Sequence, residues 1–232
     1  MKRIAIIALS MLLAAPVFAQ NEEGSLDIIK SSDEKVSLSA IDHLGYGFHF
    51  VNSEAFTPNK WNSGDFFLNL LKLKIRPVEN FGITISADVD WHFFSSKTHA
   101  FVLDSGKKVQ AADFSKAVID ASAKNNRGHF YYTAFNFPVL LKGYFGKFQI
   151  GAGAEASLNL KGSIRYSYDY DDLHFEVSEQ KAETNKFSYG FVATASYDGL
   201  GVFCKYYPKS SKILPDGSVD LNFFTVGLCL SM

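Results

Sequence analysis

The sequence predicts an all-β fold, an eight-stranded antiparallel transmembrane β-barrel with short periplasmic turns and long extracellular loops. From Lys147 to Tyr168, apolar and polar residues alternate, which is the period of two that a β-strand shows. A tilted strand that crosses a membrane needs about 9–11 residues, whereas strands of soluble proteins usually have about five or six. Two further observations agree: a secretory signal precedes the strands, and short and long connections alternate between them.

The N-terminus has the three regions of a cleavable signal peptide, which we place at residues 1–19. Lys2 and Arg3 precede an apolar run, and small residues precede a cleavage site between Ala19 and Gln20. Residues 20–41 are mostly polar and are expected to form a periplasmic lead-in to a barrel domain at 42–232. Cleavage of the signal removes Lys2 and Arg3 and leaves 21 Lys and Arg residues and 24 Asp and Glu residues. This charge balance does not indicate nucleic-acid binding.

The first four strands follow from alternation between turn residues. In the first strand, one face has Leu44, Tyr46, Phe48 and Phe50, and the other has His43, Gly45, Gly47 and His49. In the third strand, a long apolar face is opposed by Thr84, Ser86, Asp88, Asp90 and His92. Pro77–Asn80 joins the second strand to the third. The predicted ranges are Asp42–Val51, 66–76, Phe81–Phe94 and Gly128–Tyr144.

The last four strands are predicted in the same way. Phe145–Gly146 turns the fourth strand into the fifth, which belongs to the alternating stretch described above. Asp198–Gly199 is a dipeptide suited to a two-residue hairpin between the sixth and seventh strands. The fifth strand is expected to end near Leu160, and the remaining ranges are Lys186–Tyr197, Leu200–Tyr207 and Val219–Met232.

The connections alternate between tight turns and long loops. The long loops are expected at 52–65, 95–127, 162–185 and 208–218. Short periplasmic turns and longer outer loops are typical of bacterial outer-membrane barrels. We therefore expect the chain to reside in the cell outer membrane, and the even strand count places both termini in the periplasm.

The segment Phe135–Leu160 resembles the core of the small outer-membrane β-barrel family common in Bacteroidetes, which includes PorT-like components of a protein-secretion apparatus. The matching residues are Phe137, Pro138, Val139, Leu140, Leu141, Lys142 and Tyr144, followed by Gly151 and Gly153. The resemblance implies the barrel fold and the envelope location over about residues 42–232, but it does not define one role. Met232 departs from the aromatic residue at which many such barrels end.

Charged residues at inward positions predict an interior ion-pair network, because unpaired charges would be costly inside an eight-stranded barrel filled by its own side chains. A proton or ion pathway is the alternative use of the same groups. The inward candidates are Lys72, Lys74, Arg76, Asp88, Asp90, Lys142, Glu155, Lys161 and Lys205.

The outer loop after the fifth strand is aromatic and acidic, and it is a candidate contact surface for a partner or a cation. The alternative is a strand that projects past the membrane and ends in a solvated acidic tip. The residues are Tyr166, Tyr168, Tyr170, Asp171 and Asp172. Cys204 and Cys229 are interpreted as small apolar residues, with a disulfide as the alternative.

His49 is a candidate for lipid-directed catalysis, since it lies near Asn52, Ser53 and Glu54 at the outer end of the first strand. The spacing does not match a His-x-Ser-Asn arrangement, and the chain has no Gly-x-Ser-x-Gly motif. The histidines have no spacing typical of a metal site. We therefore expect no catalytic residues, no cofactor-binding residues and no metal ligands.

The sequence thus favours a non-enzymatic integral outer-membrane barrel that presents surface loops around a closed, side-chain-filled interior. The alternatives are a PorT-like component of a secretion or envelope assembly complex and a lipid-modifying outer-membrane enzyme. The expected partners are outer-membrane lipid and lipopolysaccharide, with other envelope proteins as further candidates and no nucleic acid.

Overall fold

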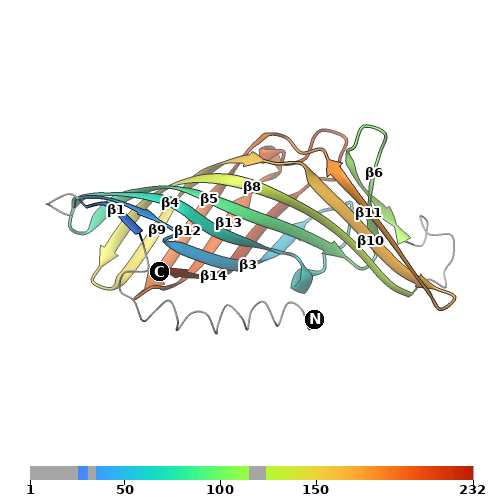
Figure 1. The fold of residues 1–232 in the computed structure, drawn as a ribbon, viewed down its shortest axis with the longest axis horizontal. Coiled ribbons are helices and arrows are strands. Elements are labelled where there is room, and N and C mark those ends of the chain that lie inside the picture. Colours follow the sequence, from blue (N-terminus) through green and yellow to red (C-terminus); the bar gives the residue numbers. More distant parts are fainter. Residues whose placement is uncertain (1–25, 31–34, 115–123, 232) are drawn as a thin grey trace.

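The computed structural model describes residues 26–30, 35–114 and 124–231, and their regular structure is almost entirely β-strand (Figure 1). Two short 3-10 helices, η1 (Lys60–Asn62) and η2 (Lys209–Ser211), are the exceptions in these ranges. The strands are β1 (Leu26–Lys30), β2 (Val36–Ala40), β3 (His43–Asn52), β4 (Gly64–Val78), β5 (Phe81–Ser96), β6 (His99–Leu103), β7 (Val109–Asp113), β8 (Lys124–Phe145), β9 (Phe148–Asn159), β10 (Gly162–Tyr170), β11 (Leu173–Ala182), β12 (Phe187–Tyr197), β13 (Leu200–Tyr207) and β14 (Asn222–Ser231). Within the described part of the chain, no helix is both long and apolar enough to cross a membrane.

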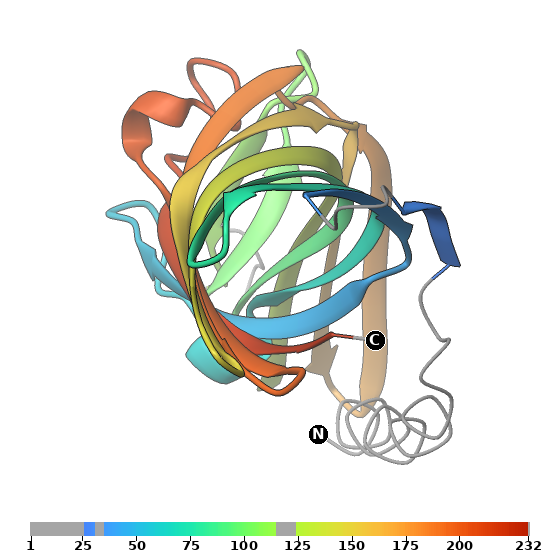
Figure 2. The ribbon, with the colours of Figure 1, turned by 90° about the vertical axis from the view of Figure 1, so that its left-hand side faces the viewer.

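The main sheet curls into a ring, which Figure 2 shows from the end that carries the tight turns. Every strand of the ring pairs antiparallel with two neighbours, and β14 pairs back with β3. The order around the ring is β3, β4, β5, β8, β9, β12, β13 and β14. Each range predicted as a strand from the sequence overlaps one of these ring strands.

The tight turns lie where the sequence predicts them. At the β12–β13 turn, Asp198 has a φ of 49° and Gly199 a φ of 87°. A two-residue hairpin of this hand needs positive φ at both central positions, and glycine adopts that conformation without steric cost. The three tight turns and the end of β14 share one end of the ring, called the turn end below, and the opposite end is called the loop end (Figure 1).

Two connections expected as loops contain hairpins. β6 and β7 pair within 95–127, and β10 and β11 pair within 162–185. The alternating stretch 147–168 is therefore not one strand, because it breaks at Leu160 and Lys161 into β9 and β10. Both of these strands pair with the long β8, β9 along residues 134–145 and β10 along residues 124–131. β8, β10 and β11 consequently form a flap that extends past the ring (Figure 1).

The segment 20–41, expected to be a polar lead-in, contains β1 and β2. β2 runs beside residues 71–75 of β4, in line with β3, and Ile41 with a φ of 53° separates the two. β1 pairs with β2 in turn. Both strands have only five residues, and the alternation of β2 (VSLSA) is too short to stand out beside the long alternating strands of the ring. The signal segment 1–19 and its cleavage site lie outside the described residues.

The ring is polar inside and apolar outside over most of its length. Buried inward side chains include Asp65, Asn69, Thr84, Ser86, Asp88, Asp90, Asn136, Glu155, Ser157 and Lys205. The opposite parity of the same strands exposes large apolar side chains, among them Phe50, Leu71, Ile85, Val139, Leu141, Ile150, Phe191, Val202, Val226 and Leu228. This distribution reverses that of a soluble globular domain.

Candidate functional site

A buried charge cluster lies about midway along the ring interior. The ammonium group of Lys205 on β13 donates to the carboxylate of Asp90 on β5, and it lies 3.8 Å from the carboxylate of Asp65 on β4. Glu155 on β9 is 2% exposed and interacts electrostatically with the same lysine. Opposite charges from four strands thus meet where water is excluded, which is the requirement for tolerating a buried charge.

Asp65 and Asn69 belong to this interior but are absent from the residues predicted there. The reason is a bulge in β4, where the pairing with β5 skips from Asn69 to Leu71. The bulge turns both Leu70 and Leu71 outward and shifts the inward parity from odd positions to even ones. A parity counted back from Lys72 therefore places Asp65 and Asn69 on the wrong face. Asn69 donates to Asp88 at 2.7 Å.

Two stacked histidines lie next to the charge cluster toward the loop end. The rings of His49 and His92 are 5.4 Å apart between centroids and inclined by 20°. Nδ1 of His49 lies 2.8 Å from the Thr225 hydroxyl. Both side chains are fully buried inside the ring, so the imidazole of His49 does not reach the lipid-facing surface. The geometry gives no support to lipid-directed catalysis at His49.

The loop end of the interior is closed by an apolar core. Aromatic side chains from the ring, including Phe94, Phe130 and Phe223, pack against residues of the outer connections. Those contributed by the connections are Phe56, Phe101, Val109, Ile164, Ala182, Ile213, Leu214, Val219 and Leu221. The loops consequently fold over the ring and fill its mouth with side chains.

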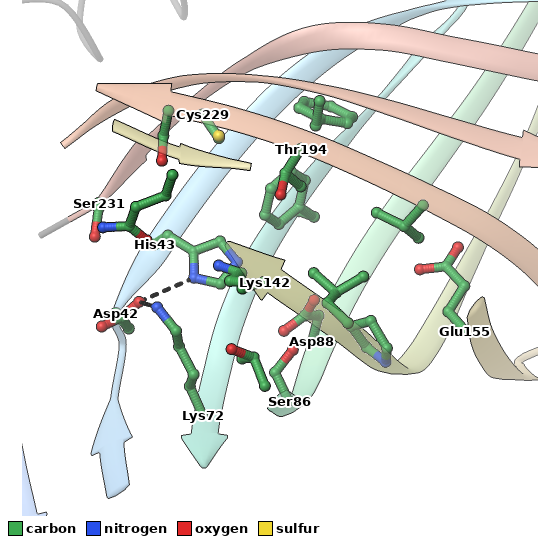
Figure 3. A pocket seen from close by; sticks show the side chains of 18 of the residues that line it. Asp42, His43, Lys72, Ser86, Asp88, Lys142, Glu155, Thr194, Cys229 and Ser231 are labelled. Carbon is green, nitrogen blue, oxygen red and sulfur yellow. Dashed lines mark hydrogen bonds and ion pairs between the residues drawn. The ribbon is translucent and has the colours of Figure 1, made fainter. Parts of the chain in front are cut away.

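The turn end, in contrast, contains an open cavity of about 80 Å³ (Figure 3). The charged residues that line it are Asp42, Lys72, Asp88 and Lys142, with Glu155 and Lys205 at its inner limit. The other polar lining groups are His43, Thr84, Ser86, Gln149, Thr194, Ser196, Cys229 and Ser231. At about 10–15 Å³ for each water in this measure, the cavity has room for several water molecules.

The predicted cations divide among three environments. Lys72 pairs with Asp42 at the cavity wall, and Lys74 and Arg76 lie over the ring of Tyr144, at 4.9 and 4.3 Å from its centroid. Lys142 projects into the cavity, and no described carboxylate forms an ion pair with it (Figure 3).

Lys161 does not belong to the interior, contrary to the prediction. It lies in the break between β9 and β10, where the alternation ends, and its exposed ammonium group pairs with Glu183 at 2.8 Å. The period of two assigns a face only while the strand continues, and here it does not.

Asp42 lies between β2 and β3 at the rim of the cavity. Burial raises the pKa of its carboxyl group, but hydrogen bonds and charge interactions with His43 and Lys72 outweigh burial and hold the pKa well below its usual range. The carboxylate therefore stays ionised and fixes Lys72 (Figure 3).

The predicted contact surface lies on the flap. Tyr166 and Tyr168 pack against Ala100 and Phe114 of the β6–β7 region, so their rings are partly occupied by internal packing. Asp171 and Asp172 form the exposed turn from β10 to β11, both with positive φ. Next to this turn, hydrogen bonds with His174 and Asn125 lower the pKa of Asp169.

The two cysteines are free in the structure. Cys229 lines the cavity, whereas Cys204 has the outward parity of β13, next to inward Phe203 and Lys205. The described residues contain no group of three His, Cys, Asp or Glu side chains arranged to hold a metal ion.

Comparisons with known proteins add little. No protein-family model and no curated protein matches the chain. Similar solved structures include engineered proteins of asymmetric conductivity (TM-score 0.22, 11% identity) and two substituted forms of the Rhodobacter blastica porin (TM-scores 0.21 and 0.20, each 10% identity). Each match covers 85% of this chain and 100% of the other. Likeness this weak does not assign the chain to a family, and the PorT-like resemblance stays a prediction.

Proposed function

We propose that the chain is a non-enzymatic integral protein of the outer membrane, whose eight ring strands close a transmembrane β-barrel. The observation that carries this proposal is the reversed polarity of the ring. Contiguous exposed apolar surface on this scale is unfavourable in water and is satisfied by lipid. The ring strands also have suitable lengths, such as 12 residues in β9 and 11 in β12, since about 9–11 tilted residues cross a bilayer.

The proposed barrel has no open pore. An eight-stranded barrel is just wide enough to be filled by its own side chains. Here the charge cluster of Lys205, Asp90 and Asp65 fills the middle, and the apolar core fills the loop end. Among the described residues, the polar interior opens to water at the turn end, through the cavity there.

The proposed role is the presentation of a surface outside the cell, with the turn end and both chain termini in the periplasm. The flap of β8, β10 and β11 supplies this surface. β11 is the last strand of its sheet and pairs with β10 alone among the described strands. Leu173 and Phe175 are exposed along it, and an exposed edge strand with apolar side chains can pair with a strand of a partner.

Labelling of single cysteines in intact cells tests the location and the orientation. In a chain without Cys204 and Cys229, we expect Asp171→Cys to react with a membrane-impermeant maleimide on intact cells. Asn80→Cys, in the tight β4–β5 turn, should react only after the outer membrane is permeabilised. Labelling of the Asn80 position alone on intact cells would contradict the orientation, and labelling of neither position in any membrane fraction would contradict the proposal.

The flap edge also suits the alternative role, that of a PorT-like component of a secretion or assembly complex. Purification of the tagged protein from mildly solubilised membranes separates the two. Stoichiometric envelope proteins that are lost when Phe175 is replaced by Lys would support the assembly role. A lone monomer would support a self-contained surface barrel.

A further inference from the structure

The turn-end cavity carries one cation that the ion-pair network does not use. Lys72 is neutralised by Asp42 and Lys205 by Asp90, but Lys142 pairs with no described carboxylate. Its side chain points into the cavity among Lys72, Thr194 and Cys229 (Figure 3). A lysine that forms no ion pair in a restricted polar space is a candidate partner for an anion.

The charged groups at the outer part of the cavity are Lys142, Lys72 and Asp42, which interact electrostatically. Asp42 already pairs with Lys72. Farther in, Asp88 accepts a hydrogen bond from the neutral amide of Asn69, and Glu155 interacts with Lys205. Lys142 is therefore a cation of this cavity that forms no ion pair with a described carboxylate.

Glycines flank Lys142 on both neighbouring strands. Gly82 on β5 pairs with Lys142 on one side and Gly151 on β9 pairs with it on the other. A Cβ atom on Gly151 would lie 3.1 Å from Cγ of Lys142 and 2.9 Å from Oγ1 of Thr194. The absence of a side chain at position 151 thus lets the aliphatic part of Lys142 and the Thr194 hydroxyl approach each other.

The polar lining favours an anion with several acceptor oxygens. Thr84, Ser86, Thr194, Ser196 and Ser231, which carry hydroxyl groups, line the same cavity as Lys142. A tetrahedral phosphate group can accept from one lysine and several hydroxyls at once, and lysine binds phosphate as a point charge. A cavity of about 80 Å³ holds several water molecules, which is enough for the five heavy atoms of such a group.

We propose that the turn-end cavity binds a phosphate group, held by Lys142 and the hydroxyls that line the cavity. The site goes beyond the proposed function and depends only on the ring, so it is tested on folded protein in detergent micelles. The group can come from free phosphate or from a phosphate ester such as a headgroup. A failure of phosphate binding leaves the membrane location untouched.

Calorimetric titration of the purified protein with inorganic phosphate tests the site. We expect saturable binding, weakened about tenfold or more by Lys142→Met, because a hydrogen bond to a charged group is lost. Lys142→Arg should retain most of the affinity, and Lys161→Met should bind like the parent. Lys142→Gln provides a second neutral variant if the methionine variant does not fold.

A parallel titration with glycerol phosphate distinguishes the sources. Binding of both ligands supports a phosphate ester as the natural group, and binding of inorganic phosphate alone supports the free anion. The proposal is overturned if folded protein shows no saturable binding of either ligand. It is equally overturned if Lys142→Met and Lys161→Met bind phosphate with the same affinity.

Discussion

Replacement of Lys205 by methionine should cost more stability than any single change at the surface of the ring. Lys205 is 3% exposed, donates to Asp90 and lies 3.8 Å from Asp65. Its ammonium group also lies 4.6 Å from the centroid of the Phe67 ring. Methionine fills a similar volume but leaves both carboxylates buried without a counter-charge.

The magnitude follows from that loss. Removal of one partner of a buried ion pair costs about 3–5 kcal/mol, because the other charge stays desolvated and uncompensated. The total stability of a protein is usually about 5–15 kcal/mol, so the variant should be close to the limit of folding. Lys161→Met is the matched control. It removes an exposed partner of Glu183, whose pair contributes about 0–1 kcal/mol.

Urea unfolding in detergent micelles, followed by tryptophan fluorescence, measures these differences. The double variant Lys205→Met with Asp90→Asn should recover about 1 kcal/mol or more of the loss, since one of the orphaned charges is removed as well. The interpretation of the interior would be refuted if Lys205→Met lowered the free energy of unfolding by less than about 1 kcal/mol, as the surface control should.

Three further predictions concern packing, pH and conduction. Gly153→Ala should lower the free energy of unfolding by about 2 kcal/mol or more, because the new Cβ would lie 1.9 Å from the Val139 carbonyl oxygen. The control Ala154→Ser, on the outward face, should change the free energy of unfolding by less than about 0.5 kcal/mol. Equal effects of the two substitutions would contradict close packing at Gly153. Asp42→Asn should cost about 1–3 kcal/mol at pH 7. Because the folded-state pKa of Asp42 is depressed, the stability difference between the parent and Asp42→Asn is present above about pH 4 and shrinks as the pH falls further. An equal stability difference at pH 7 and pH 2.5 would contradict an ionised Asp42 that stabilises the fold. In planar bilayers the protein should show no stable conductance, and a reproducible open channel would contradict the closed loop end.

The ring strands could be predicted because lipid on one side and a polar interior on the other impose a period of two. β5 is the clearest case, since every residue from Phe81 to Phe93 keeps its predicted face. The interior positions of Asp88, Asp90, Glu155 and Lys205 follow directly from this alternation.

Other features could not be predicted because they break that period. The bulge at Leu70 moves Asp65 and Asn69 inward, and nothing in the composition of β4 marks one extra residue. β10 continues the alternation of β9 after a short break, although it belongs to the flap. His49 lies at the same parity as Gly45 and Gly47, which face the interior of the ring. The alternation along β3 therefore indicates an inward His49, away from the lipid that a catalytic role would require it to reach.

The central claim is that the apolar outside of the ring faces lipid, and Trp91 offers the most direct test. Its side chain is 40% exposed on the outward face of β5. In a Trp61→Phe chain reconstituted in vesicles of brominated lipid, we expect strong quenching of Trp91 fluorescence. A Phe203→Trp reporter that faces the interior, in a chain without Trp61 and Trp91, should be quenched little. Unquenched Trp91 fluorescence, or equal quenching of the two reporters, would contradict the account.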